Sequence, residues 1–128
     1  MSYNNNKIVA TSFDDTLLKV AEELKKEGFG VLTEIDVKAT LKKKLDVEFR
    51  NYRILGACNP TFAFKALQME ENMGVMLPCN VVVQEKESGE VQVSVINPME
   101  SMQTIHNEKL LDVAQEVSER LNRVLANL

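Results

Sequence analysis

The stretch CNVVVQEKESGEVQVSVIN, residues 79–97, places alternating apolar and polar side chains on both sides of a polar turn. This pattern predicts a β-hairpin whose turn lies at Ser88–Gly89. Because successive side chains of a strand point to opposite faces, the valines of both runs share one face. A lone hairpin is at best marginally stable in water, so other elements must cover that face. The predicted buried set is Val81, Val83, Val91, Val93 and Val95.

Two amphipathic segments can provide this cover. The segment TSFDDTLLKVAEELKKEGFG, residues 11–30, predicts a helix that Ser12 caps and Gly28 ends, with aspartates in its first turn and lysines in its last. A second helix is predicted after Asn107, with an apolar stripe that continues to Leu128. A helix with one apolar stripe packs that stripe against a core and exposes its other side.

The rest of the chain predicts three further strands and two shorter helices, in the overall order β-α-β-α-β-α-β-β-α. One-faced strands that alternate with one-striped helices predict an α+β fold, a two-layer sandwich with helices on one face of a sheet of about five strands. The hairpin makes this sheet mixed in our prediction. The predicted strands are residues 7–11, 29–35 and 51–58. One helix begins after Asp36, with Val37, Leu41 and Leu45 on one stripe, and the other begins at Asn59–Pro60. Residues 71–78 are predicted to form a loop.

Length and composition predict a single domain over residues 1–128. A chain of 128 residues buries about two thirds of the surface of its unfolded form, so it needs neither a disulfide nor a metal to make a core. Its net charge of −4 disfavours non-specific nucleic-acid binding. No segment resembles a signal peptide or reaches membrane-spanning length, which predicts a cytoplasmic location, no membrane partner and reduced cysteines.

Three spaced motifs resemble the domain-of-unknown-function 302 family. A strand ends in Gly-x-Cys-Asn-Pro at residues 56–60, a Leu-Pro-Cys at residues 77–79 leads into the valine-rich hairpin, and an Asn-Pro-Met follows it at residues 97–99. The resemblance continues through the closing amphipathic helix and covers nearly the whole chain. It implies a small α/β sandwich that forms a homodimer, and it implies no reaction.

Cys58 has two interpretations. It directly precedes a predicted helix N-terminus, where unpaired N–H groups and the helix dipole favour a thiolate. However, Asn59 is the predicted cap and competes for those N–H groups, and no neighbouring base is evident. A small buried thiol is the simpler interpretation, and it applies to Cys79 as well. The two thiols lie on the same rim of the sheet only if their strands run antiparallel.

The methionines suggest a third possibility. Met73 and Met76 lie just before Cys79, and Met99 and Met102 follow the hairpin. Soft thioethers and thiolates suit copper(I), although methionine more often fills irregular apolar gaps. Two cysteines and the single histidine, His106, do not complete a zinc site. The sequence therefore predicts no metal and no cofactor.

These observations favour a small-ligand or partner-binding module over an enzyme, because no catalytic base is evident. The expected partners are a second copy of the chain and a small molecule, with no nucleic acid. The alternative function is thiol-based redox chemistry or sulfur handling at Cys58, alone or with Cys79. The candidate ligand-binding residues surround the third strand, the Met-rich loop and the hairpin: Tyr52, Cys58, Asn59, Met73, Met76 and Cys79.

Overall fold

The computed structural model describes residues 2–128, which form five strands, five α-helices and two short 3-10 helices. In chain order these are β1 (Asn4–Val9), α1 (Phe13–Lys26), β2 (Gly30–Asp36), α2 (Val37–Leu45), β3 (Tyr52–Cys58), α3 (Pro60–Met69), η1 (Met73–Met76), β4 (Cys79–Glu85), β5 (Val91–Ile96), α4 (Pro98–Ser101), η2 (Gln103–Ile105) and α5 (Glu108–Ala126).

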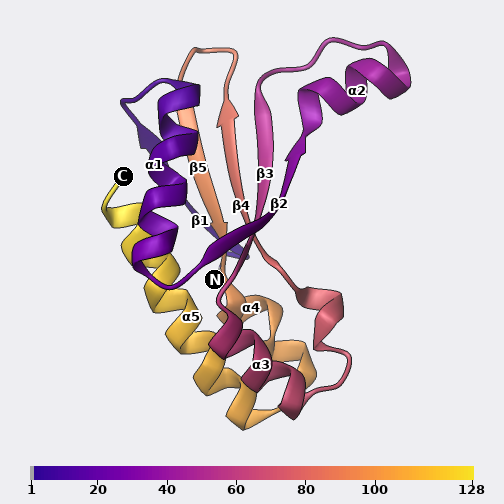
Figure 1. The fold of residues 1–128 in the computed structure, drawn as a ribbon, viewed down its shortest axis with the longest axis vertical. Coiled ribbons are helices and arrows are strands. Elements are labelled where there is room, and N and C mark those ends of the chain that lie inside the picture. Colours follow the sequence, from indigo (N-terminus) through magenta and orange to yellow (C-terminus); the bar gives the residue numbers. More distant parts are fainter. Residues whose placement is uncertain (1) are drawn as a thin grey trace.

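The strands form one sheet in the order β1-β5-β4-β3-β2, and the predicted α+β class is confirmed (Figure 1). Every neighbouring pair is antiparallel, so the sheet is not mixed as the sequence suggested. Parallel neighbours would need a crossover between adjacent strands. Here α1 instead connects the two edge strands, β1 and β2, while α2 and α3 lie beyond the sheet ends in connections that return to the neighbouring strand.

Helices α1 and α5 cover one face of this sheet, α5 over β1 and β5 and α1 over β2 and β4 (Figure 1). The prediction for the hairpin valines is confirmed, since each is at most 4% exposed on this face. They pack with apolar side chains of both helices in one hydrophobic core. Within residues 2–128, no helix combines the length and the apolar character that crossing a membrane requires.

Strand β1 begins and ends earlier than the predicted strand over residues 7–11. Asn4 pairs with Ile96 of β5, and the N–H of Asn97 donates to the Tyr3 carbonyl at 2.8 Å. The first three residues of this strand are asparagines, so the apolar pattern did not indicate that the strand begins there. Lys7 then ties the strand to the end of α5, because its Nζ donates to the Leu128 carbonyl at 2.9 Å.

The expectation that α2, like the other helices, packs its apolar stripe against the sheet is wrong. Val37 and Leu41 are only partly buried and Leu45 is 66% exposed, so α2 has no buried residue. The reason is its position, since α2 follows an edge strand and projects beyond the end of the sheet, where no other element covers it (Figure 1).

Gly56 allows a close approach on the face of β3 that the helices leave uncovered. A Cβ atom there would overlap Thr33 Oγ1 of β2 and would lie 2.7 Å from Cγ of Pro78. The Leu77–Pro78 peptide bond is cis. A side chain at residue 56 would therefore force apart two segments that pack across the strand.

We expect Gly56→Ala to lower the free energy of unfolding by about 1–3 kcal/mol, because the added methyl group overpacks this contact. Urea unfolding followed by circular dichroism would measure the loss. Gly30→Ala is the matched control, since a Cβ at Gly30 meets nothing within 4 Å. Equal midpoints for the two variants would contradict the steric argument.

Candidate functional site

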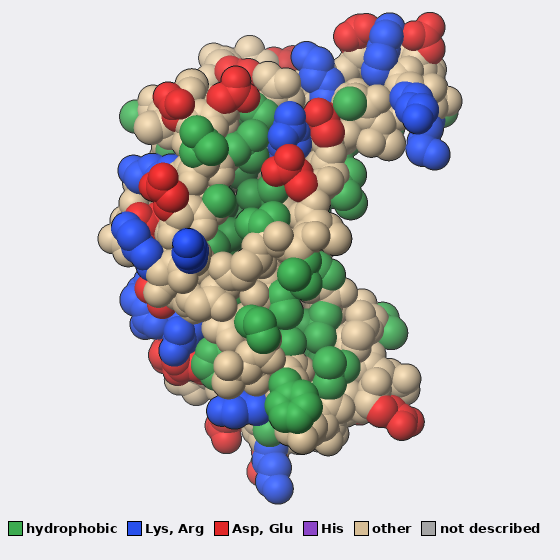
Figure 2. Space-filling model, in the orientation of Figure 1, with side chains coloured by type: hydrophobic (Ala, Val, Ile, Leu, Met, Phe, Trp, Pro, Cys, Tyr) green, Lys and Arg blue, Asp and Glu red, His purple; other side chains and the backbone are tan. Residues whose placement is uncertain are grey.

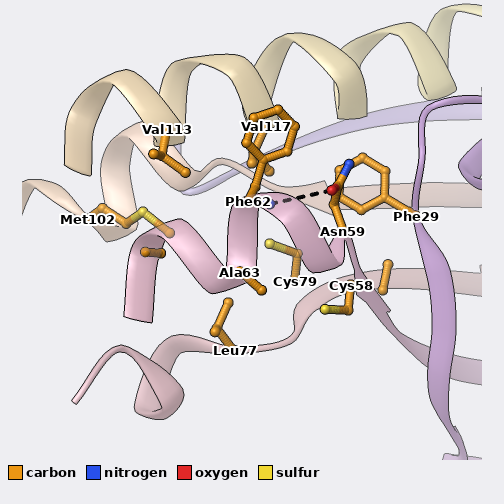
Figure 3. Close-up of a pocket in the computed structure, with 12 residues that line it drawn as sticks. Phe29, Cys58, Asn59, Phe62, Ala63, Leu77, Cys79, Met102, Val113 and Val117 are labelled. Atoms are coloured by element: carbon orange, nitrogen blue, oxygen red, sulfur yellow. Dashed lines mark hydrogen bonds between the residues drawn. The ribbon is translucent and has the colours of Figure 1, made fainter. Parts of the chain in front are cut away.

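Cys58, Asn59 and Cys79 come together where β3 ends and β4 begins. Ala57 lies opposite Cys79 in the antiparallel register, so both thiols lie on one rim of the sheet. Both line a small cavity with Phe62 of α3 and Met102, as Figure 3 shows. Its volume is about 20 Å³, which is roughly the space that one water molecule occupies. The cavity is thus too small for an organic ligand in this conformation.

Asn59 is 8% exposed, and its side-chain amide links the start of α3 to the end of α1. Its Oδ1 accepts from the Phe62 N–H at 3.5 Å, which confirms the predicted cap of α3. Its Nδ2 donates at 3.4 Å to the carbonyl of Glu27, the residue that ends α1. Arg120 of α5 donates from Nη1 to the same carbonyl at 3.0 Å. Asn59 is therefore a structural residue at the junction of α1, α3 and α5.

Gly28 makes room for this junction. Its φ of +86° lies in the left-handed region, where glycine is strongly preferred. A Cβ at this position would lie 2.8 Å from Nδ2 of Asn59. The glycine that ends α1 and the Asn-Pro pair that begins α3 thus form one contact, although they lie far apart in the sequence.

The two thiols have different environments. Cys79 is 7% exposed, and burial, with a smaller contribution from Cys58 nearby, raises its pKa to about 11. Cys58 is half-buried, and the cap of the adjacent helix is Asn59 rather than the thiol. None of the residues that line the cavity is acidic or basic. The cavity therefore offers no side chain that could take a proton from either sulfur.

The other predicted ligand-binding residues lie elsewhere. Met73 is 1% exposed within the core, and Met76 packs against the core from η1. Tyr52 projects from the uncovered face of β3, where it lines a separate hollow with Gln84 and Gln92. Residues 2–128 contain no group of three or more His, Cys, Asp or Glu side chains arranged to hold a metal ion. The structure thus brings together three of the six predicted residues.

Sequence reasoning missed a large exposed apolar surface. Among residues 2–128, eleven large hydrophobic side chains are exposed, and eight of them lie between residues 31 and 75. They belong to β2, α2, α3, η1 and the loop after α2, and we call them the apolar surface. Figure 2 shows hydrophobic side chains gathered over the lower lobe and around the notch below α2. The eight are Val31, Leu32, Ile35, Leu45, Val47, Phe64, Leu67 and Val75.

This fold and junction define a small two-layer α+β domain whose Cys-Asn-Pro turn joins helices across the sheet end. The family described as domain of unknown function DUF302 matches residues 5–128, and the chain belongs to it. A crystal structure of an uncharacterized conserved DUF302 protein from Bacillus stearothermophilus is similar, with a TM-score of 0.92 and 28% identity over 99% of this chain and 98% of that one. No curated protein matches the chain. The family resemblance predicted from the motifs is thus confirmed.

We expect Asn59→Ala to lower the free energy of unfolding by about 1–3 kcal/mol, because it removes a helix cap and leaves the Glu27 carbonyl with fewer donors. Chemical denaturation measures the change. Asn72→Ala is the matched control, because Asn72 precedes η1 but makes no side-chain capping bond. If both variants unfold at the same denaturant concentration, the Asn59 junction contributes nothing.

The raised pKa of Cys79 predicts a loss of stability at alkaline pH. Above the ordinary value of 9.0 the unfolded chain releases the proton, while the folded chain keeps it up to about pH 11. The unfolded state then binds fewer protons, so the free energy of unfolding falls across this window, by roughly 2–3 kcal/mol in total. Urea unfolding at several pH values measures this slope.

Cys79→Ala is the control for this experiment, because it removes the buried thiol and retains every other ionisable side chain. Its stability should fall less steeply between pH 9 and pH 11 than that of the parent chain. Parallel curves for the two proteins would show that the folded state does not hold this proton.

Proposed function

We propose that this protein is a partner-binding module that assembles as a homodimer through the apolar surface. The observation that carries the proposal is that eight of the eleven exposed large hydrophobic side chains among residues 2–128 belong to β2, α2, α3 and the segments beside them. Leu32 is 68% exposed, Phe64 is 64% exposed and Val75 is 86% exposed. Large exposed apolar patches on soluble domains mark interaction sites. A side chain of this kind contributes about 1.5–3 kcal/mol when it is fully buried.

The state of α2 supports a protein partner. This helix has nine residues and none of them is buried. Helices this short are marginal in water and are normally stabilised by packing. Leu45 and Val47 at its end are exposed, and Lys42 forms ion pairs with Asp46 and Glu48 that hold the end of the helix together. A partner that packs on α2 would supply the missing apolar contact.

The charges of β2 favour a second copy as that partner. Glu34 and Asp36 are the only charged residues of this strand. Both pair with Arg53 of the same chain, at 3.1 Å and 3.3 Å. Two copies that meet at β2 would therefore not bring unpaired carboxylates together. In a two-fold dimer the same patch contacts itself, and exposed apolar side chains can pack against copies of themselves.

The edge of β2 determines what kind of contact is expected. A β-bulge between Val31 and Thr33 interrupts its pairing with β3, and bulges at sheet edges disfavour a continuous ladder with another chain. We therefore place the dimer contact in the side chains of β2, α2 and α3 rather than in a shared sheet. Binding is favoured over thiol chemistry because the cysteine cavity is small and has no base in its lining.

We expect light scattering at micromolar concentration to give about twice the monomer mass of 14.4 kDa. Leu32→Asp and Phe64→Asp should each shift the protein toward the monomer, because a buried unpaired carboxylate opposes association. Leu18→Asp is the matched control: Leu18 is 67% exposed, like Leu32, but it lies on α1 outside the apolar surface.

Circular dichroism should show that all three variants keep the fold, since each residue is exposed in the monomer. The proposal fails if the parent protein is a monomer across this concentration range. It also fails if Leu18→Asp dissociates the dimer as effectively as Leu32→Asp does.

A further inference from the structure

The sheet face that the helices leave uncovered is hollowed. The hollow has a volume of about 470 Å³, within the range of small-molecule sites. It is more than twenty times larger than the cavity beside the cysteines. The strand register arranges side chains across it in two rows, one of Tyr52, Gln84 and Gln92 and one of Val82, Ser94 and Asn6. Beyond these rows Ile96 pairs with Asn4, and Asn80 lies two residues before Val82 on the same face of β4.

The lining of the hollow is polar but uncharged. Five amide side chains and the hydroxyl of Ser94 surround a floor that includes Val82 and Ile96. Tyr3, beside the start of β1, and Tyr52, at the start of β3, lie toward opposite corners of the register. None of these lining residues is charged, and the Arg50 guanidinium beside them is engaged by Gln84 and by the rings of Phe49 and Tyr52. The neutral lining favours a neutral ligand with many hydrogen-bonding groups.

Most of these amides retain unused donors or acceptors. Within residues 2–128, Asn6 donates to Asn4 at 3.1 Å and Gln92 donates to Ser94 at 3.1 Å. Arg50 reaches in from the rim and donates from Nε to Oε1 of Gln84, also at 3.1 Å. Among the described residues 2–128, these contacts leave the Asn6 and Gln92 carbonyl oxygens and the Gln84 amide nitrogen without a hydrogen-bond partner. The amide of Asn80 likewise makes no side-chain hydrogen bond to the described part of the chain.

We infer that this hollow binds a neutral carbohydrate. Each hydroxyl group of a sugar both donates and accepts, and a side-chain amide offers both complements in a fixed plane. The apolar floor can contact the C–H face of a sugar ring, and tyrosines present large rigid apolar faces beside a polar group. The hollow shares no residue with the apolar surface, so the two can be altered by separate substitutions.

The test is a titration of ¹⁵N-labelled protein with glucose, galactose, N-acetylglucosamine and maltose, followed by NMR of the side-chain amide groups. We expect at least one sugar to give saturable shifts of the Asn80, Gln84 and Gln92 amides. Gln92→Ala should weaken that binding roughly two- to tenfold, the effect of one neutral hydrogen bond. Gln115→Ala on the opposite side of the molecule, on α5, is the matched control and should bind like the parent.

Three results would overturn the inference. The first is the absence of saturable amide shifts with all four sugars. The second is equal binding by Gln92→Ala and Gln115→Ala. The third is a shift of the same amides with protein concentration alone, which would mean that a second copy covers the hollow. Repeating the titration on the Leu32→Asp variant keeps this result separate from the dimer proposal, since its hollow is unchanged and should still bind the sugar.

Discussion

The valine face of the β4–β5 hairpin, packed beneath α5 and α1, is the interaction on which the rest of the fold depends. These strands lie in the middle of the sheet, and their five valines are at most 4% exposed. Burying each valine stabilises the fold by about 1.5–3 kcal/mol, so both long helices pack on this side of the sheet. The opposite face is then left without a covering layer. The polar hollow is thus a consequence of where the apolar residues of the hairpin lie.

The Asn59 junction is the second constraint, and it accounts for the Cys-Asn-Pro motif without any chemistry. Asn59 caps α3 and bonds to the end of α1, while Arg120 brings α5 to the same carbonyl of Glu27. Because the chain turns into α3 directly after β3, Cys58 lies beside this junction. Cys79 is opposite the last residues of β3 and is buried there. The two thiols therefore lie on one rim of the sheet, because β3 and β4 are antiparallel and β3 ends where β4 begins.

The sequence predicted what depends on local pattern and missed what depends on pairing across the chain. The valine alternation and the caps at Ser12 and Asn59 were correct, because the responsible residues are neighbours in sequence. The stripe of α2 shows only that one side of the helix is apolar, and it cannot reveal whether anything covers that side. The hollow combines four strands, and Asn4 lies opposite Ile96, so no local pattern indicates it. The predicted ligand-binding residues do not form one site for the same reason. Tyr52 and Asn59 belong to one strand and the turn after it, but Tyr52 lines the hollow and Asn59 lines the cavity beside the cysteines.

The cavity beside the cysteines differs from the hollow and the apolar surface in what a ligand would have to displace. The cavity beside the cysteines holds about 20 Å³, and a ligand could enter only if core side chains such as Met102 moved. Displacing a buried side chain of this size gives up its packing contacts in the core before any contact with the ligand is made. The hollow and the apolar surface require no such rearrangement, because both are already open to solvent. They would also suit different partners, since side-chain amides can hydrogen-bond to polar groups, and exposed leucine, valine and phenylalanine can pack against apolar ones. A single antiparallel sheet with one covered face therefore leaves a polar hollow and exposed apolar side chains open to solvent at the same time.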